Sequence, residues 1–170
     1  MIALLAVAAI GIGLWRLESA SAGLEVERTR VGAVPVTLYR PASPGPSPVV
    51  LIAHGFSGSQ QLMQSFAITL ARNGFLALTF DFPGHGRNAV PFVTSIEDQE
   101  RRVGLLLGAL EAVADFAAGL PSSDGTLALL GHSMAGDVLV RYASARRDSV
   151  AATVLVSPYL AENAPTAEPR

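Results

Sequence analysis

A serine in a tight turn between small residues has the clearest potential for chemistry. The segment Gly131-His132-Ser133-Met134-Ala135-Gly136 follows four apolar residues and leads into a helical pattern. A turn from strand to helix pushes the serine hydroxyl out of the sheet, and its neighbours must be small because larger side chains would clash with the backbone. Ala135 takes the fifth position of the usual G-x-S-x-G pattern and is still small. The alternative is an ordinary strand-to-helix turn with a chance serine.

Two earlier loops also carry residues suited to catalysis. His54-Gly55-Phe56 follows the apolar run 49–53, and a loop from Asp81 to Gly86, which contains His85, follows the apolar run 75–80. The carboxyl ends of parallel strands meet at one edge of a sheet, where ligands bind. These two loops are therefore expected to converge on Ser133.

The elements that position these loops follow from the hydrophobic pattern, which predicts an α/β fold with a mostly parallel sheet and helices on both faces. Two antiparallel edge strands are expected within 24–39, and buried parallel strands at 49–53, 75–80, 126–130 and 150–156. A helix with the apolar residues Leu62, Phe66 and Leu70 ends at Asn73-Gly74, and a long helix covers 96–118. Right-handed crossovers distribute the helices over both faces.

Composition limits the class of protein. The 170 residues are 50% hydrophobic and 15% charged, which argues for one domain with a substantial core and against disorder. The net charge of −2 gives no basic surface for nucleic acid, so no nucleic-acid partner is expected. The absence of cysteine excludes disulfides, thiolate catalysis and cysteine-ligated metals. No ligand set for a metal or an organic cofactor is visible, and none is expected.

The first 17 residues form a separate segment, an N-terminal hydrophobic helix. No charged side chain occurs before Arg16, and fifteen helical residues span roughly 22 Å, short of the ~30 Å hydrocarbon core of a membrane. Ala20-Ser21-Ala22 fits the pattern of a signal-peptidase site. The segment is predicted to be a transmembrane anchor or, alternatively, a cleaved export signal or a buried core helix. Either of the first two would place the domain 24–160 at or beyond a membrane, with a loose tail at 161–170.

The three loops, in this order and spacing, resemble the N-terminal two-thirds of the α/β-hydrolase fold. They are most similar to its serine aminopeptidase-like and lysophospholipase- or esterase-like members. The resemblance implies that Ser133 is a nucleophile for an ester, thioester or amide, taken from a small-molecule or lipid-like substrate. It also implies an oxyanion hole built from the backbone N–H groups of Phe56 and Met134. The supporting residues of the loops would be His54, Gly55, Asp81, His85 and Gly131.

The chain departs from this family in one respect. The family order is serine, acid, histidine, but no histidine follows Ser133. Asp137 is expected to face solvent or cap a neighbour, whereas His54 and His85 are expected to be structural and Asp81 to bind backbone amides. The sequence therefore predicts a fragment that lacks the acid and base of the triad and hydrolyses esters weakly or not at all. The alternatives are a non-catalytic domain that keeps the binding pocket, or a piece with no independent fold.

Overall fold

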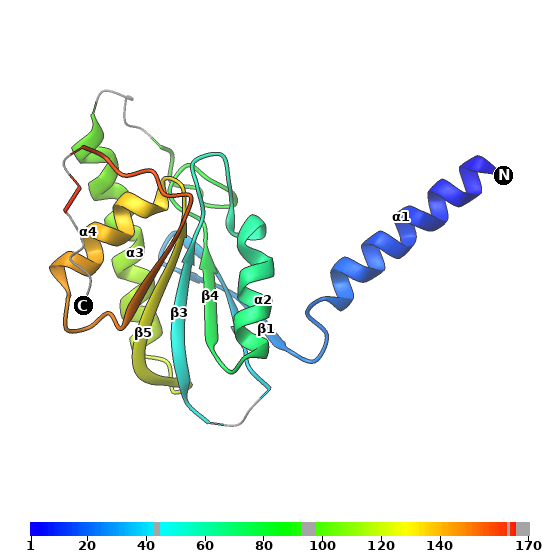
Figure 1. Cartoon of the computed structure of the whole chain (residues 1–170), viewed down its shortest axis with the longest axis horizontal. Coiled ribbons are helices and arrows are strands. Elements are labelled where there is room, and N and C mark those ends of the chain that lie inside the picture. Colours follow the sequence, from blue (N-terminus) through cyan, green and yellow to red (C-terminus); the bar gives the residue numbers. More distant parts are fainter. Residues whose placement is uncertain (43–44, 93–97, 163, 166–170) are drawn as a thin grey trace.

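One six-stranded sheet organises the computed structural model, which describes residues 1–42, 45–92, 98–162 and 164–165 (Figure 1). The strand order is β1-β2-β4-β3-β5-β6. Strands β3 to β6 are parallel, and β2 pairs antiparallel with β1 and β4. The mostly parallel α/β fold predicted from sequence is confirmed. The strands are β1 (Glu25–Val31), β2 (Val34–Arg40), β3 (Ser47–Ala53), β4 (Leu76–Phe80), β5 (Ser123–His132) and β6 (Ala152–Val156).

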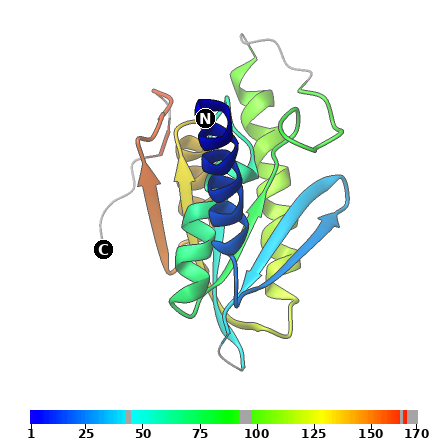
Figure 2. The same cartoon turned by 90° about the vertical axis from the view of Figure 1, so that its right-hand side faces the viewer.

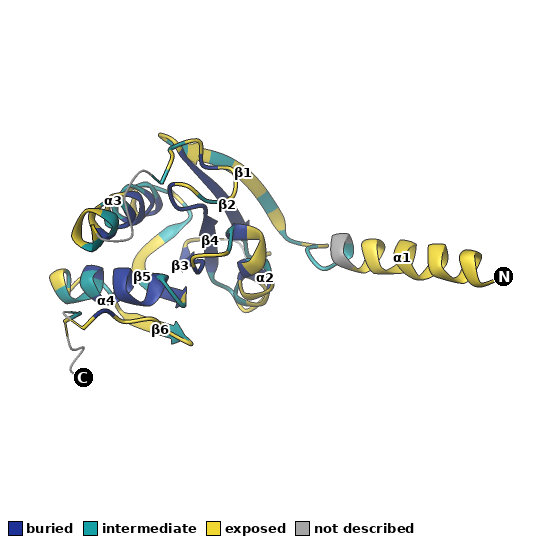
Figure 3. Ribbon diagram, turned by 90° about the horizontal axis from the view of Figure 1, so that it is seen from above, coloured by how far each residue is buried: buried dark blue, intermediate teal, exposed yellow. Residues whose placement is uncertain are grey.

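Helices cover both faces of this sheet, as Figure 3 shows from above. The helical elements of the chain are α1 (Ile2–Ser19), the 3₁₀ turn η1 (Gln60–Met63), α2 (Gln64–Arg72), α3 (Gln99–Ala118) and α4 (Ala135–Ala145). Helix α2 lies on one face, and α3 and α4 lie on the other. Successive side chains of a strand point to opposite faces. In β3, Leu51 therefore joins the core beneath α3 and α4, whereas Val50 and Ile52 join the core beneath α2. The predicted start of the long helix at Ile96 lies outside the described residues.

The segment made of η1 and α2 turns a different face to the sheet from the one marked by its largest apolar residues. Leu62 is 68% exposed and Phe66 is 38% exposed, although the sequence pattern grouped them with Leu70. The buried positions are Met63, Ala67, Ile68 and Ala71. Two alanines on the inner face let the helix backbone lie close to the sheet, and close packing of many atoms stabilises this face.

The two edges of the sheet differ in cover, as Figure 2 shows with the β1–β2 hairpin at one side and β6 at the other. The sequence predicted a buried parallel strand at 150–156; the parallel strand is present as β6, but its predicted burial was wrong. Strand β6 is the outer strand of the described sheet, and its residues are exposed or half-buried, with Val154 51% exposed. An outer strand has a neighbour on one side only, so a continuous apolar run does not guarantee burial.

The N-terminal helix α1 extends away from the sheet (Figure 1). Its side chains from residue 2 to residue 16, including Leu4, Ile10 and Trp15, are exposed, so the alternative of a buried core helix was wrong. Within the described residues, no helix combines the length and the apolar character that a membrane crossing requires.

Candidate active site

The backbone of Ser133 adopts a conformation that non-glycine residues rarely take. Its φ of 51° lies in the left-handed region, which costs on the order of 1–3 kcal/mol and persists only where surrounding contacts hold it. The Ser133 N–H donates to the carbonyl of Val156 at 3.1 Å, so β6 holds one side of the turn. The Ser133 carbonyl accepts from the N–H groups of Gly136 at 2.8 Å and Tyr159 at 3.0 Å. These bonds present a half-buried serine between β5 and α4.

Small residues around the turn are required by close packing. A Cβ at Gly131 would lie 2.5 Å from Leu139 Cδ1 and 3.1 Å from Ala135 Cβ. A Cβ at Gly136 would lie 2.7 Å from the Cβ of Pro158. The first turn of α4 therefore packs directly against the end of β5, which explains the small residues on both sides of Ser133.

The loop after β3 approaches Ser133 closely. A Cβ at Gly55 would lie 2.8 Å from His132 Nδ1 and 3.0 Å from Ser133 Cβ, so only glycine fits there without a shift. Phe56 follows with a side chain that is 59% exposed. Among the residues that the structure describes, neither the N–H of Phe56 nor that of Met134 donates a hydrogen bond within the chain. Two backbone donors next to the serine turn are thus left for a ligand.

His54 is completely buried and joins two of the three loops. Its Nε2 accepts a hydrogen bond from the N–H of Phe82 at 3.1 Å, so the proton of the neutral ring is on Nδ1, which lies 2.8 Å from the carbonyl of Gly55. Burial lowers the pKa of His54 below its ordinary value, and the positive form of His85 would lower it further. A neutral imidazole with both nitrogens engaged is a structural link and has no free lone pair for Ser133.

This link predicts a loss of stability in acid. The unfolded chain takes up a proton on His54 near pH 6.5, whereas the folded chain does so only at lower pH. The free energy of unfolding should therefore fall as the pH drops below 6.5, by at most about 1.4 kcal/mol per pH unit from this residue. Urea titrations at pH 7.5 and 5.5 measure the effect. In His54→Gln the drop should be smaller, and an equal drop would contradict the prediction.

Asp81 is also completely buried and holds the loop after β4. Its carboxylate accepts from Gln60 N at 2.8 Å, from Gln60 Nε2 at 2.8 Å and from Arg87 N at 3.0 Å. Gly86 lies against the same carboxylate with a φ of +54°, and a Cβ there would overlap the Asp81 oxygens. The carboxylate therefore fixes loop geometry, and none of its bonds reaches a histidine.

His85 belongs to a group of aromatic rings that links the loops after β3 and β4. Its Nδ1 donates to the carbonyl of Pro83 at 2.8 Å. The residue is half-buried. The ring centroid lies 5.2 Å from that of His54, 5.6 Å from Phe56 and 5.5 Å from Phe92. The contacts with Phe56 and Phe92 are edge-to-face, an arrangement that is favourable at these distances. They make an apolar wall between the loops after β3 and β4.

Comparison with known proteins agrees with this arrangement. The sequence model of the family described as serine aminopeptidase, S33, matches residues 44–169, which is most of the chain. The chain belongs to this family of α/β-hydrolases. The resemblance inferred from the three loops is therefore confirmed.

The relatives and similar structures of this member of the S33 family have low sequence identity to it. Cutinase 1 of Thermobifida cellulosilytica is 28% identical over 130 residues, which cover 75% of this chain and 46% of the cutinase. A structure of Est1E from Butyrivibrio proteoclasticus with ferulic acid bound has a TM-score of 0.64 at 25% identity, covering 78% of this chain and 52% of that one. A hypothetical protein from Pseudomonas aeruginosa has a TM-score of 0.70 at 21% identity, covering 81% and 44%, and shows the fold alone. The chain spans about half the length of these relatives.

A serine hydrolase needs a general base beside its nucleophile, and the described residues do not supply one. Among the described residues, no histidine nitrogen forms a hydrogen bond with Ser133 Oγ. His132 adjoins the serine but is exposed, with its ring beside Gly55. His54 and His85 bond to backbone groups instead. The site as described therefore has a positioned hydroxyl and free amides without a proton acceptor.

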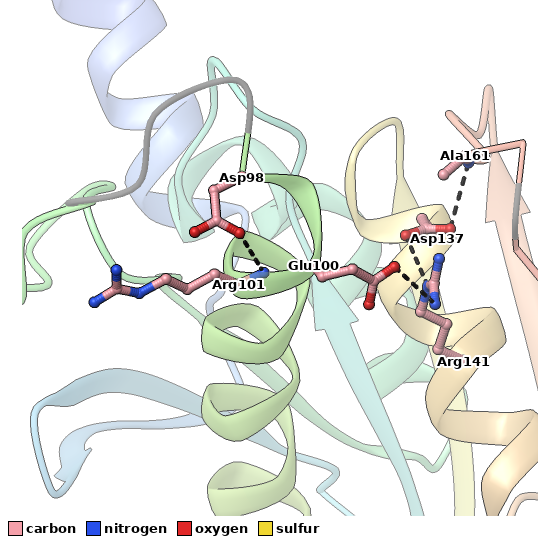
Figure 4. Close-up of polar contacts among 6 residues, drawn as sticks. All are labelled: Asp98, Glu100, Arg101, Asp137, Arg141 and Ala161. Carbon is pink, nitrogen blue, oxygen red and sulfur yellow. Dashed lines mark hydrogen bonds and ion pairs between the residues drawn. The ribbon is translucent and has the colours of Figure 1, made fainter.

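Asp137 does not face solvent, which corrects one of the two possibilities expected for it. It is 4% exposed and accepts from Arg141 Nε at 3.1 Å and from the N–H of Ala161 at 3.3 Å (Figure 4). Arg141 also lies 4.0 Å from Glu100, which connects α4 to α3. The backbone N–H of Asp137 also donates to the carbonyl of Tyr159. Asp137 therefore holds the segment after β6 against α4 through both its side chain and its backbone. No local pattern in the sequence indicates this role, because the partner Ala161 lies 24 residues further along the chain.

Proposed function

We propose that the chain is the nucleophile-bearing part of a serine hydrolase that acts through Ser133 on carboxylic esters. The observation that carries this proposal is the left-handed Ser133 at the β5–α4 turn, beside two backbone N–H groups without a partner in the described chain. Membership of the S33 family supports the same chemistry. In this proposal Phe56 and Met134 contribute the oxyanion-hole amides.

The reaction would proceed by acylation. Ser133 Oγ attacks the ester carbonyl and forms a C–O bond, while its proton leaves to a base and the former carbonyl oxygen becomes an oxyanion. Two aligned N–H donors stabilise this charge, each by about 3 kcal/mol. The first turn of α4 adds the positive end of a helix dipole. Collapse of the intermediate expels the alcohol, and water then hydrolyses the acyl–serine ester.

We place esters ahead of thioesters and amides because of the relatives and the wall of the site. The relatives include cutinases, and the ferulic acid complex of Est1E is a similar structure. The exposed ring of Phe56 and its neighbours His85 and Phe92 offer an aromatic surface next to Gly55, the residue that adjoins the serine. Such a surface suits an uncharged acyl or aryl group.

The proposal for location follows from the N-terminal segment. The Ala20-Ser21-Ala22 sequence and the exposed apolar helix α1 support the export-signal alternative. The membrane-anchor alternative has no support from the helix itself, given the result for the described helices. Export therefore stays the prediction to test, by sequencing the N-terminus of the secreted protein.

A second function remains open because the described site has no base. Both nitrogens of His54 are engaged and the Asp81 carboxylate accepts from Gln60 and Arg87, so the same site would bind a carbonyl compound without turnover. A fluorophosphonate probe separates the two functions. Its electrophilic phosphorus needs one attack per protein, so an oxyanion-stabilised serine becomes labelled slowly even with a weak base. Labelling of Ser133, located by mass spectrometry, supports the hydrolase, and an unlabelled protein supports the binding domain.

The close approach of Gly55 predicts the effect of one methyl group. Gly55→Ala places a Cβ 3.0 Å from Ser133 Cβ, which forces the loop with the Phe56 amide away from the serine. Loss of one oxyanion donor lowers rates by about 100-fold or more, so labelling of Ser133 should slow to that extent. The comparison is with Gly108→Ala in α3, whose φ is not positive and whose Cβ meets no atom within 4 Å beyond its own helix backbone. Equal labelling rates in the two variants would rule out an oxyanion role for this loop.

A further inference from the structure

Three arginines meet at a cavity outside the serine site. The cavity is open to solvent, has a volume of about 500 Å³ and is lined by Arg28, Arg30 and Arg87, with Thr37 and Gln60 among its other lining residues. In the part of the chain that the structure describes, none of its lining residues is acidic. It lies over β1 and β2, whereas Ser133 follows β5, and strands β4 and β3 separate the two. The cavity is therefore a second site with a concentration of positive charge.

The alternation of side chains between the two faces of β1 produces the positive charge of the cavity. Arg28 and Arg30 lie two residues apart and point to one face, opposite Thr37 and Pro35 of β2. The acidic residues of β1 point to the other face, where Glu25 and Glu27 lie 3.5 Å and 2.7 Å from Arg40. The hairpin thus separates its acidic side chains from these two arginines, which leaves the cavity face uncompensated by β1.

Backbone contacts position two of the arginines. Arg30 donates from Nη1 to the carbonyl of Ala33 at 3.1 Å and from Nη2 to the carbonyl of Arg87 at 3.3 Å. A guanidinium has five N–H donors, so donors remain for a ligand. The N–H of Arg87 donates to Asp81 at 3.0 Å, which holds the backbone of Arg87 from its other side. Positioned donors lose less conformational freedom on binding than mobile ones.

The polar groups nearest the three arginines do not neutralise the positive charge of the guanidinium groups. Burial raises the pKa of Tyr39, so this side chain stays a neutral phenol although Arg28 acts on it. Asp81 is buried behind Gln60, and its oxygens already accept three N–H groups. Gln60 Oε1 is occupied by the hydroxyl of Thr37 at 2.7 Å. The cavity therefore offers many donors and few free acceptors.

We propose that this arginine cavity binds a phosphate-class oxyanion, either inorganic phosphate or the phosphate group of a monoester. Guanidinium groups match the geometry of phosphate oxygens and form paired, charge-assisted hydrogen bonds with them. A doubly charged anion uses three arginines better than a single carboxylate does. The cavity is larger than a phosphate ion and falls in the range of small-molecule sites, so it leaves room for the organic part of an ester.

Isothermal titration of the 170-residue chain tests the proposal, with inorganic phosphate and phenyl phosphate as ligands at low ionic strength. We expect saturable binding of one anion per chain. Arg28→Gln should weaken it by at least about tenfold, because the variant removes a charge-assisted donor. Tighter binding of phenyl phosphate would assign the site to monoesters, and equal binding would assign it to free phosphate.

The control is Arg72→Gln, which removes the same charge from an exposed position at the end of α2, away from the cavity lining. Binding to this variant should match that of the unmodified chain. Arg87→Gln provides a second cavity variant whose backbone contacts are kept, in case Arg28→Gln lowers the melting temperature. Failure of the unmodified chain to bind either ligand, or equal weakening by Arg28→Gln and Arg72→Gln, would overturn the proposal. Neither result depends on Ser133.

Discussion

Ser133→Ala is expected to lower the rate of covalent labelling by a fluorophosphonate by at least about 100-fold, because the variant lacks the attacking oxygen. The hydroxyl is the one that the strained turn presents, with φ at 51° and its backbone fixed by Val156 and Tyr159. Gel fluorescence over several hours, followed by peptide mapping, measures the loss. Ser65→Ala is the matched control, since Ser65 is an exposed helical serine outside the site. Persistent labelling of Ser133→Ala would place the reactive group elsewhere.

Turnover of a short-chain nitrophenyl ester should respond differently to the same variant. Loss of one triad member lowers kcat by about 10⁴-fold or more, and further losses add little because the triad acts as a unit. Since no described histidine bonds to Ser133, the 170-residue chain is expected to hydrolyse the ester weakly or not at all. Ser133→Ala should then change this low rate only slightly. Rapid hydrolysis that disappears in Ser133→Ala would show that a base acts on this serine.

Asp81→Asn is expected to lower the free energy of unfolding by about 3–5 kcal/mol. The completely buried carboxylate accepts three hydrogen bonds from Gln60 and Arg87, at 2.8, 2.8 and 3.0 Å. An asparagine amide has one oxygen, and its NH₂ group would face an N–H donor. Because a domain is stable by only about 5–15 kcal/mol, much of the population would unfold at moderate urea. Urea titration followed by circular dichroism measures the change.

Two comparisons separate this network from general effects. Asp124→Asn makes the same change at an exposed carboxylate with a single bond, to Thr126 N at 2.8 Å, and should cost about 1 kcal/mol or less. Gly86→Ala forces a Cβ onto the Asp81 oxygens, whereas Gly32→Ala has a similar φ of +58° but meets no atom within 4 Å. Gly86→Ala should therefore destabilise more than Gly32→Ala. Similar losses for Asp81→Asn and Asp124→Asn would show that the buried network contributes little.

The sequence alone determined the fold class and the order of the elements. Continuous apolar runs at 49–53 and 75–80 became β3 and β4, because strands covered on both faces need apolar side chains throughout. The turn at Ser133 was visible because only small residues tolerate the contact between the end of β5 and α4. These features depend on short stretches of chain, whose pattern is set by strand and helix periodicity.

Only the tertiary structure decided which groups bond to one another. His54 takes its partner from Phe82, 28 residues away, and Asp137 takes one from Ala161, 24 residues away. Periodicity reports which face of an element is apolar but not which element comes to lie beside it. It also failed for β6 and for α2, because burial depends on the layers that neighbouring elements supply. The arginine cavity has the same origin, since Arg87 reaches Arg28 and Arg30 only when the loop after β4 folds back over the hairpin.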